Sequence, residues 1–233
     1  MPEQESRATA YTTLAAGSDL RHELEIKRSR FITVLRRAMD EDAARSLVAE
    51  LRKEFHDARH HCSAFVLGPD RDVQRSSDDG EPSGTAGIPM LEALVKRETL
   101  PGVSDLSDVS AVVVRYFGGI LLGAGGLVRA YSESVSSALD AAPLVRRSRL
   151  RICAVPVPHA QAGRLENELR AAGFVMADSS YEAEHTVLRL ALPDNAADIA
   201  DAGARLAALT AGSAGLLPQG TEWIDRSLDM SGF

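Results

Sequence analysis

The sequence predicts an α+β protein of two domains, and three observations lead to this prediction. Its 233 residues are enough for one large domain or two small ones. The pattern of apolar residues starts again after Arg146-Arg147. The second half then follows the order strand, helix, strand, strand, helix, strand, which is typical of a ferredoxin-like βαββαβ domain. We therefore expect domains over 20–147 and 148–233, with the boundary near Ser148.

The first half is expected to mix strands with amphipathic helices. Residues 1–20 are small and polar, which suggests a tail or a loose first strand, and Glu23 to Leu35 alternates weakly, as in one strand with a basic wet face. Asp40 is placed to cap a helix that runs to Phe55, with apolar residues at steps of three and four. The elements expected next are a strand at Cys62–Leu67, a polar loop at Arg75–Gly87, a helix at Ile88–Leu94, a strand at Val109–Val114, a glycine-rich loop at Gly118–Gly126 and a helix at Leu127–Leu139.

The second half is simpler. Pro156 and Pro158 mark the end of its first strand, Gly173 ends its first expected helix and Asp194 caps the second. The expected elements are a strand at Leu150–Val157, a helix at Ala160–Ala172, strands at Val175–Tyr181 and Thr186–Leu192, a helix capped by Asp194 that reaches Leu209, and a strand at Leu216–Ile224.

Composition narrows the class of protein. Hydrophobic residues make up 45% and charged residues 25%, as in ordinary globular chains. The net charge of -7 argues against a generally basic nucleic-acid coat, so contact with nucleic acid needs a local basic patch. The stretch Leu206–Thr221 lacks charges but is too short and polar to cross a bilayer, and the N-terminus shows no secretory signal. Two cysteines, Cys62 and Cys153, are expected to be reduced thiols, so we expect a cytoplasmic protein without membrane contact.

The first segment that can carry chemistry is Asp57–Cys62. Its two histidines, His60 and His61, lead into a strand, so at most one of them points to each face. Consecutive ligands cannot converge on one tetrahedral ion, so we expect no metal here. The interpretation that we favour is that one histidine packs in the core and the other lies at the edge of a cleft.

The second segment, Ser76–Gly87, crowds three acids and several hydroxyls into one loop. The acids Asp78, Asp79 and Glu81 suit either divalent-cation binding or general acid–base catalysis. The alternative is a solvated turn that caps the next helix through Ser83 or Thr85. The spacing of the acids is not that of an EF-hand. The segment is longer than a capping turn needs, which favours a function.

The third segment runs from Arg115 to Tyr131 and passes from a buried strand through a glycine-rich loop into a helix. Such glycines let backbone N–H groups approach an anion at the helix N-terminus, and two flanking arginines can hold phosphate. The segment matches neither a Walker loop nor a Rossmann fingerprint. The alternative is close packing of helix on sheet. The candidate anion-binding residues are Gly118, Gly119, Gly123, Gly125, Gly126, Arg115 and Arg129.

These three segments, in this order and spacing, closely resemble the Impact family and specifically its bacterial YigZ-type branch. The resemblance covers about residues 20–145, and the tail resembles the additional C-terminal domain of that branch. It implies an N-terminal two-layer α/β domain of the ribosomal-protein-S5-domain-2-like type, followed by a domain like the fifth domain of translocating elongation factors. Eukaryotic members regulate translation through a further N-terminal domain. Only about 20 residues stand in that place in this sequence, so the partner of that domain is not carried over. Some bacterial members carry a proline-dipeptidase label, but the spaced carboxylates and histidine of a two-metal peptidase are missing.

Two hypotheses about function follow, and the first favours binding over catalysis. It is a cytoplasmic, translation-associated protein that contacts RNA, the ribosome or a translation factor without a cofactor or a metal. Besides the resemblance, it rests on a basic stretch without acids, whose nucleic-acid-binding candidates are Lys27, Arg28, Arg30, Arg36 and Arg37.

The alternative is an uncharacterised enzyme or a small-molecule or phosphate-binding protein. In this hypothesis the polar loop and the glycine-rich loop face each other across a cleft. One of the two histidines of the first segment is the base, one of the three acids of the second is the acid, and Arg115 or Arg129 holds a phosphate. The discriminating observation is whether these side chains line one concave pocket.

Overall fold

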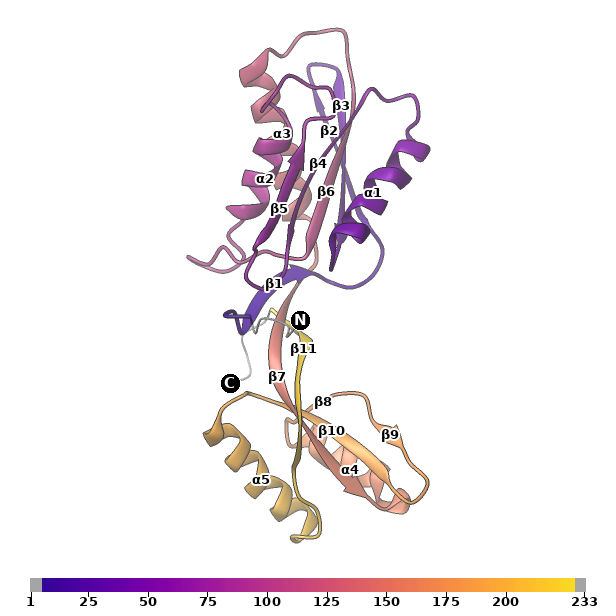
Figure 1. Ribbon diagram of the computed structural model, residues 1–233, viewed down its shortest axis with the longest axis vertical. Coiled ribbons are helices and arrows are strands. Elements are labelled where there is room, and N and C mark those ends of the chain that lie inside the picture. Colours follow the sequence, from indigo (N-terminus) through magenta and orange to yellow (C-terminus); the bar gives the residue numbers. More distant parts are fainter. Residues whose placement is uncertain (1–5, 229–233) are drawn as a thin grey trace. The chain divides into compact units, whose positions relative to one another are not determined.

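The computed structural model describes residues 6–228, and in it the chain forms two compact units (Figure 1). The first contains the described residues up to Arg146 and from Arg226 on, and the second is Arg147–Asp225. This division falls next to the position where the sequence pattern starts again. Compactness does not test independent folding, so the domains 20–147 and 148–233 stay predictions as folding units.

The first unit is built on a five-stranded sheet in the order β2-β3-β6-β4-β5, in which every neighbouring pair is antiparallel. A further short strand, β1 (Ala10–Leu14), precedes it. The five strands are β2 (Leu20–Ile26), β3 (Ser29–Arg37), β4 (His60–Leu67), β5 (Val73–Ser77) and β6 (Val109–Tyr116).

Helices cover both faces of this sheet (Figure 1). The helices α2 (Gly87–Val95) and α3 (Ala124–Asp140) pack on the face that carries Phe31, while α1 (Glu41–Glu54) packs on the face that carries Val34. Because side chains alternate along a strand, β3 and β6 supply apolar residues to both faces. The expected two-layer domain is therefore wrong in its layering, since α1 adds a third layer.

The expected single strand at Glu23–Leu35 is instead the hairpin of β2 and β3. Ile26 pairs with Ser29, so the turn consists of Lys27 and Arg28 alone. Both have positive φ, 48° and 65°, as a type I′ turn requires. The prediction missed this turn because it lacks the usual Asn-Gly or Asp-Gly pair. Similarly, the start of the expected polar loop forms the edge strand β5.

Helix caps follow the sequence signals in part. Asp40 caps α1 as predicted, because its side chain accepts a hydrogen bond of 2.7 Å from the Ala43 N–H. In the second unit the cap predicted at Asp194 is wrong by one residue. Asn195 accepts the hydrogen bond from Asp198, while Asp194 pairs with Arg151.

The second unit has the predicted order of elements. Its strands follow the order β11-β7-β10-β8, and its helices pack on an apolar core that includes Cys153, Leu188 and Leu206. The expected strand at Val175–Tyr181 is broken into two short strands, each paired with β10. The elements are β7 (Leu144–Val157), α4 (His159–Ala171), β8 (Val175–Met176), β9 (Ser180–Tyr181), β10 (Thr186–Leu192), α5 (Ala196–Thr210) and β11 (Leu217–Ser227). None of the helices in the described part of the chain is long and apolar enough to cross a membrane.

Candidate functional site

The three segments singled out in the sequence meet at one end of the five-stranded sheet. β4 begins at His60 and β6 ends at Tyr116, and His60 pairs with Arg115 in the ladder. Arg30, at the start of β3, pairs with Tyr116. Since these strands are antiparallel, the start of one lies beside the end of the next. The same end receives the loop before α2 and the loop before α3 (Figure 1).

A buried ion pair joins two of these segments. The Arg115 guanidinium lies 2.6 Å from Glu81 Oε1, and the two side chains are only 7% and 4% exposed. The Tyr131 hydroxyl donates a hydrogen bond of 2.8 Å to the same carboxylate oxygen. The Cys62 thiol donates a longer hydrogen bond to the Tyr131 hydroxyl, so the first segment is joined as well. We call Glu81, Arg115, Tyr131 and Cys62 the buried network.

The buried network also fixes the start of the glycine-rich loop. The Arg115 guanidinium lies over the rings of Phe31 and Phe117, at 5.4 and 5.8 Å from their centroids. Ser29, at the hairpin of β2 and β3, accepts a 3.2 Å hydrogen bond from the Gly118 N–H. The hairpin and the glycine-rich loop are therefore held against each other.

Asp78 organises the polar loop rather than facing solvent as a free acid. Its carboxylate accepts hydrogen bonds of 2.8 to 3.0 Å from the N–H groups of Gly84, Ala86 and Gly87 at the start of α2. Burial opposes ionisation, but these donors outweigh it and lower the pKa of Asp78. Neither Ser83 nor Thr85 is the N-cap: that residue is Ala86, which offers no side-chain cap.

Asp79 and the two histidines form a second set of contacts. The Asp79 carboxylate accepts a 2.6 Å hydrogen bond from the His61 backbone N–H and also pairs with Arg52. His60 Nδ1 lies 2.9 Å from the Asp79 carbonyl oxygen. His61 is buried and His60 is partly exposed, as strand alternation predicted. Burial lowers the pKa of His61 although Asp79 opposes the shift, so the imidazole is mainly neutral near pH 7.

The glycines of the third segment have different structural roles. A Cβ on Gly118 would lie 2.0 Å from the backbone of Arg28, so this glycine is required for close packing. Gly119 and Gly123 have φ of 84° and 72°, which favours glycine. Gly125 and Gly126 are not loop residues but lie in the first turn of α3. Gly125 has neither a positive φ nor a neighbour within 4 Å of a Cβ, so neither backbone conformation nor close packing requires a glycine there.

Several of the predicted cationic candidates are already engaged by acids. Arg115 belongs to the buried network, and its side chain is only 7% exposed, so little of it faces solvent where a phosphate would approach. Arg30 makes two hydrogen bonds to Glu23. Arg36 binds both Asp19 and Glu50, which raise its pKa above the usual arginine range.

The basic stretch is also not one patch. Arg28 and Arg36 lie at opposite ends of β3, ~26 Å apart at ~3.3 Å per residue. Lys27, Arg28 and Arg129 are exposed, and no acid pairs with them among residues 6–228. We call these three residues the basic tip, because the hairpin turn and the start of α3 share the motif end of the sheet.

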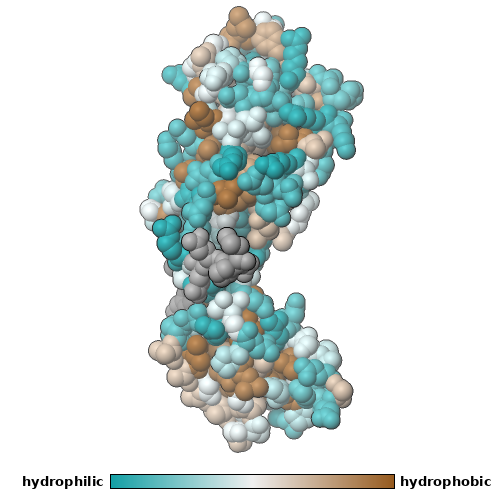
Figure 2. Space-filling view, viewed as in Figure 1, coloured by the Kyte–Doolittle hydropathy of each residue, from teal (hydrophilic) through white to brown (hydrophobic). Residues whose placement is uncertain are grey.

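Apolar side chains are exposed beside the basic tip. Leu121 is 84% exposed, and Phe117 and Ile120 in the same loop are about half exposed. Figure 2 shows that apolar and hydrophilic side chains alternate over the visible surface. The glycine-rich loop therefore presents three apolar side chains to solvent, while Leu122 packs against the core.

The thiol and the acids of the site lie in structural contacts. Burial raises the pKa of the Cys62 thiol to about 12, so its reactive thiolate form is scarce near pH 7. Within residues 6–228, no three side chains of His, Cys, Asp or Glu are grouped to hold a metal ion. The acids and histidines of the site make hydrogen bonds that hold loops and strands together.

Comparison with known families identifies the class of protein that carries this site. Residues 27–139 match the Impact N-terminal domain, and residues 155–213 match a domain of unknown function, DUF1949. The first match contains all three motif segments, and the second lies within the second unit.

The chain belongs to the Impact family. The IMPACT family member YvyE of Bacillus subtilis (strain 168) is 44% identical over 171 residues, which are 73% of this chain and 74% of that protein. The IMPACT family member YigZ of Escherichia coli (strain K12) is 43% identical over 195 residues, 83% of this chain and 91% of that protein. A crystal structure of a hypothetical protein, 41% identical, covers 90% of this chain and 97% of its own with a TM-score of 0.55. The family predicted from the three segments is thus confirmed.

Proposed function

We propose that this protein is a cytoplasmic, non-enzymatic, translation-associated protein that contacts the RNA backbone through the basic tip and the glycine-rich loop. The observation that carries the proposal is that the cations of the basic tip have no acidic partner, whereas most other candidate cations do. Lys27, Arg28 and Arg129 have no acidic partner in the described chain, while the buried network holds the loop beside them in place. Free cations on a rigid support suit an electrostatic contact with phosphates.

The chemistry of the glycine-rich loop adds to this. The N-cap of α3 is Gly123, no side chain caps the helix, and its first turn contains no acid, so its first N–H groups are open to an anion. Phe117 is partly exposed and offers a ring on which one base can stack. With a net charge of -7, the rest of the chain repels RNA, so binding depends on this local surface.

The architecture supports a link to translation by analogy. The second unit's order β11-β7-β10-β8, with two helices between strands, fits a ferredoxin-like domain of the kind that ends translocating elongation factors. The first unit is proposed to be of the ribosomal-protein-S5-domain-2-like type, with α1 as an additional layer. Likeness of fold alone is weak support for function, so the proposal rests on the basic tip.

Catalysis is the less favoured function because the candidate catalytic groups are engaged. Glu81 is bound by Arg115 and Tyr131, and Asp78 by three backbone N–H groups. A general acid or base must reach a proton of the substrate. Glu81 is buried, and both carboxylate oxygens of the partly buried Asp78 accept hydrogen bonds from the backbone. The groove described below is lined by neither of these acids.

The test is the salt dependence of RNA binding. Wild type and the triple variant Lys27→Gln/Arg28→Gln/Arg129→Gln are titrated with a fluorescent single-stranded RNA of mixed sequence at several salt concentrations. Three phosphate contacts predict a slope of log K against log salt near -2, at ~0.7 per contact, and the variant should lose most of it. The affinity should not depend on RNA sequence.

The control is Lys53→Gln/Lys96→Gln/Arg164→Gln, which removes the same charge from exposed positions elsewhere. It should change the slope little. If both triple variants bind RNA like wild type, or if wild type does not bind RNA at all, the proposed contact is wrong.

A further inference from the structure

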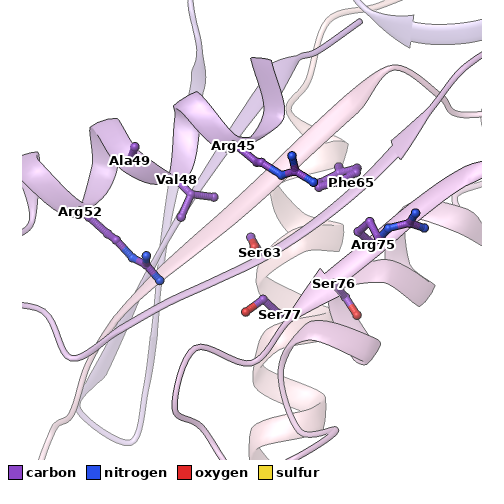
Figure 3. A pocket seen from close by; sticks show the side chains of 9 residues that line it. All are labelled: Arg45, Val48, Ala49, Arg52, Ser63, Phe65, Arg75, Ser76 and Ser77. Carbon is purple, nitrogen blue, oxygen red and sulfur yellow. The ribbon is translucent and has the colours of Figure 1, made fainter. Parts of the chain in front are cut away.

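A groove lies on the face of the sheet that α1 covers, between α1, strand β4 and the edge strand β5, with a cavity volume of about 370 Å³ (Figure 3). That volume is within the range of small-molecule sites. Its lining combines cationic, hydroxyl and apolar side chains and contains no acid. The lining residues are Arg45, Val48, Ala49, Arg52, Ser63, Phe65, Arg75, Ser76 and Ser77.

The groove exists because α1 covers only part of the sheet. Leu47 and Leu51 pack on β3 and β6, and Ala44 packs on Phe65 of β4. The residues at positions 45, 48, 49 and 52 form a neighbouring stripe at helical spacing, which faces the uncovered edge. Val48 and Ala49 are small enough to leave space between helix and strands.

The strands β4 and β5 line the groove with polar side chains, whereas the part of the sheet under α1 is apolar. Ser63 interrupts the buried side of β4, and it pairs with Ser77 across the ladder, as Phe65 pairs with Arg75. The hydroxyls of Ser63 and Ser77 make no hydrogen bond within the described chain, so they are free to bind a ligand. In Figure 3, Arg45 and Arg52 extend from α1 toward these strands.

The three arginines retain donors for a ligand. Arg52 uses one nitrogen for Asp79, and Arg45 uses one for Glu41, which also lies 4.0 Å from Arg75. A guanidinium carries five N–H donors, so each arginine keeps several. Three arginines against two acids leave a net positive charge at the groove. Arginine forks match the geometry of phosphate oxygens.

We propose that this groove binds a small phosphate-bearing molecule. The guanidinium groups of Arg45, Arg52 and Arg75 hold the phosphate with help from the serine hydroxyls, and Val48 and Phe65 form an apolar floor for the remainder. The site is separate from the basic tip and needs no RNA contact there.

The groove is connected to the motif end of the unit. Asp79 anchors Arg52, and a Cβ on Gly87 would lie 2.8 Å from the backbone of Ser77. The tight packing of α2 on β5 therefore fixes Ser77 at the groove edge. The acidic segment that marks the family thus also positions the groove.

The experiment is calorimetric titration of the full chain with two probes, inorganic phosphate and adenosine monophosphate. The variants are Arg45→Gln and Arg75→Gln, both at exposed positions that α1 and β5 tolerate. Each should weaken binding of either probe about tenfold or more. Arg164→Gln, on α4, removes the same charge far from the groove in sequence and should leave binding unchanged.

Tighter binding of the nucleotide than of phosphate supports a role for the apolar floor, and equal binding supports the phosphate site alone. Saturable binding that Arg45→Gln and Arg75→Gln leave unchanged overturns the proposal, as does the absence of binding to both probes. RNA affinity measured on the same variants separates the two sites. Loss of probe binding with normal RNA binding is the result expected here.

Discussion

The two units differ in what they bury. In the first, the charged side chains of Glu81 and Arg115 lie in the interior with Tyr131. Within residues 147–225, Thr186 is the one buried polar residue, and the ion pairs, such as Arg151 with Asp194, are partly exposed. The second unit thus shows that an interior of this chain is packed without a buried charge.

The buried ion pair of the first unit indicates which part of the molecule has a function. Burying two charges costs free energy that their attraction only partly offsets, so an ion pair like this is weak support for stability alone. The pair joins the polar loop to the strand that leads into the glycine-rich loop. We infer that it is there to hold that loop in one conformation.

The largest effect that tests this comparison is removal of the buried arginine. Arg115→Ala removes the charge that balances the buried Glu81 carboxylate and leaves the Tyr131 hydroxyl as its side-chain partner. We expect a loss of about 3–5 kcal/mol in the free energy of unfolding of the first unit. Urea unfolding followed by circular dichroism measures it. The matched variant in the second unit, Arg151→Ala, should cost about 0–1 kcal/mol. Equal losses for both would remove the basis of the comparison.

A smaller effect separates the glycines of the loop. In Gly118→Ala the new methyl group meets the backbone of Arg28, so we expect a loss of about 1–3 kcal/mol. In Gly125→Ala it meets nothing and lies in a helix, so stability should rise by up to about 1 kcal/mol. Thermal unfolding of both variants measures the difference. A neutral Gly118→Ala would show that the hairpin and the loop are not held together.

The smallest expected effect is the change in stability at low pH that the Asp78 carboxylate causes. The pKa of Asp78 is lower in the folded state than the ordinary value of 3.8, so its ionised form stabilises the fold above that pH. This stabilisation is lost as the pH falls through the lower, folded-state pKa. Asp78→Asn should lower the free energy of unfolding by on the order of 1 kcal/mol at pH 7, as for a lost helix cap. Between pH 6 and pH 3, the stability of this variant should fall less than that of the wild type. Parallel pH profiles would show that the Asp78 carboxylate is not capping α2 as a charge.

Much of the fold was predictable because it depends on local signals. The Asp40 cap, the β-branched run of β6 and the βαββαβ order of the second unit are all visible as periodicity or capping in the sequence. The hairpin of β2 and β3 was missed because Lys27 and Arg28 adopt a positive φ, which lysine and arginine do not usually favour. The packing of α1 on the second face depends on distant contacts, which no local pattern shows.

The candidate site was predicted in its segments but not in its contacts. Nothing in the spacing of Glu81 and Arg115 shows that they pair, because the contact joins residues 34 positions apart. The same holds for Arg36, whose acids Asp19 and Glu50 come from different elements. The groove under α1 was missed altogether, since its arginines belong to no motif. The sequence shows where the cationic residues are, but only the structure shows which of them form ion pairs with acids.

The most direct test of the central claim, that RNA contacts the motif end of the first unit, is hydrogen exchange of the full chain with and without saturating single-stranded RNA. We expect slower exchange in peptides that cover the β2–β3 turn at 26–29 and the loop and start of α3 at 117–129. Peptides from the second unit should change little. Protection confined to residues 147–225, or none at saturation, would contradict the account.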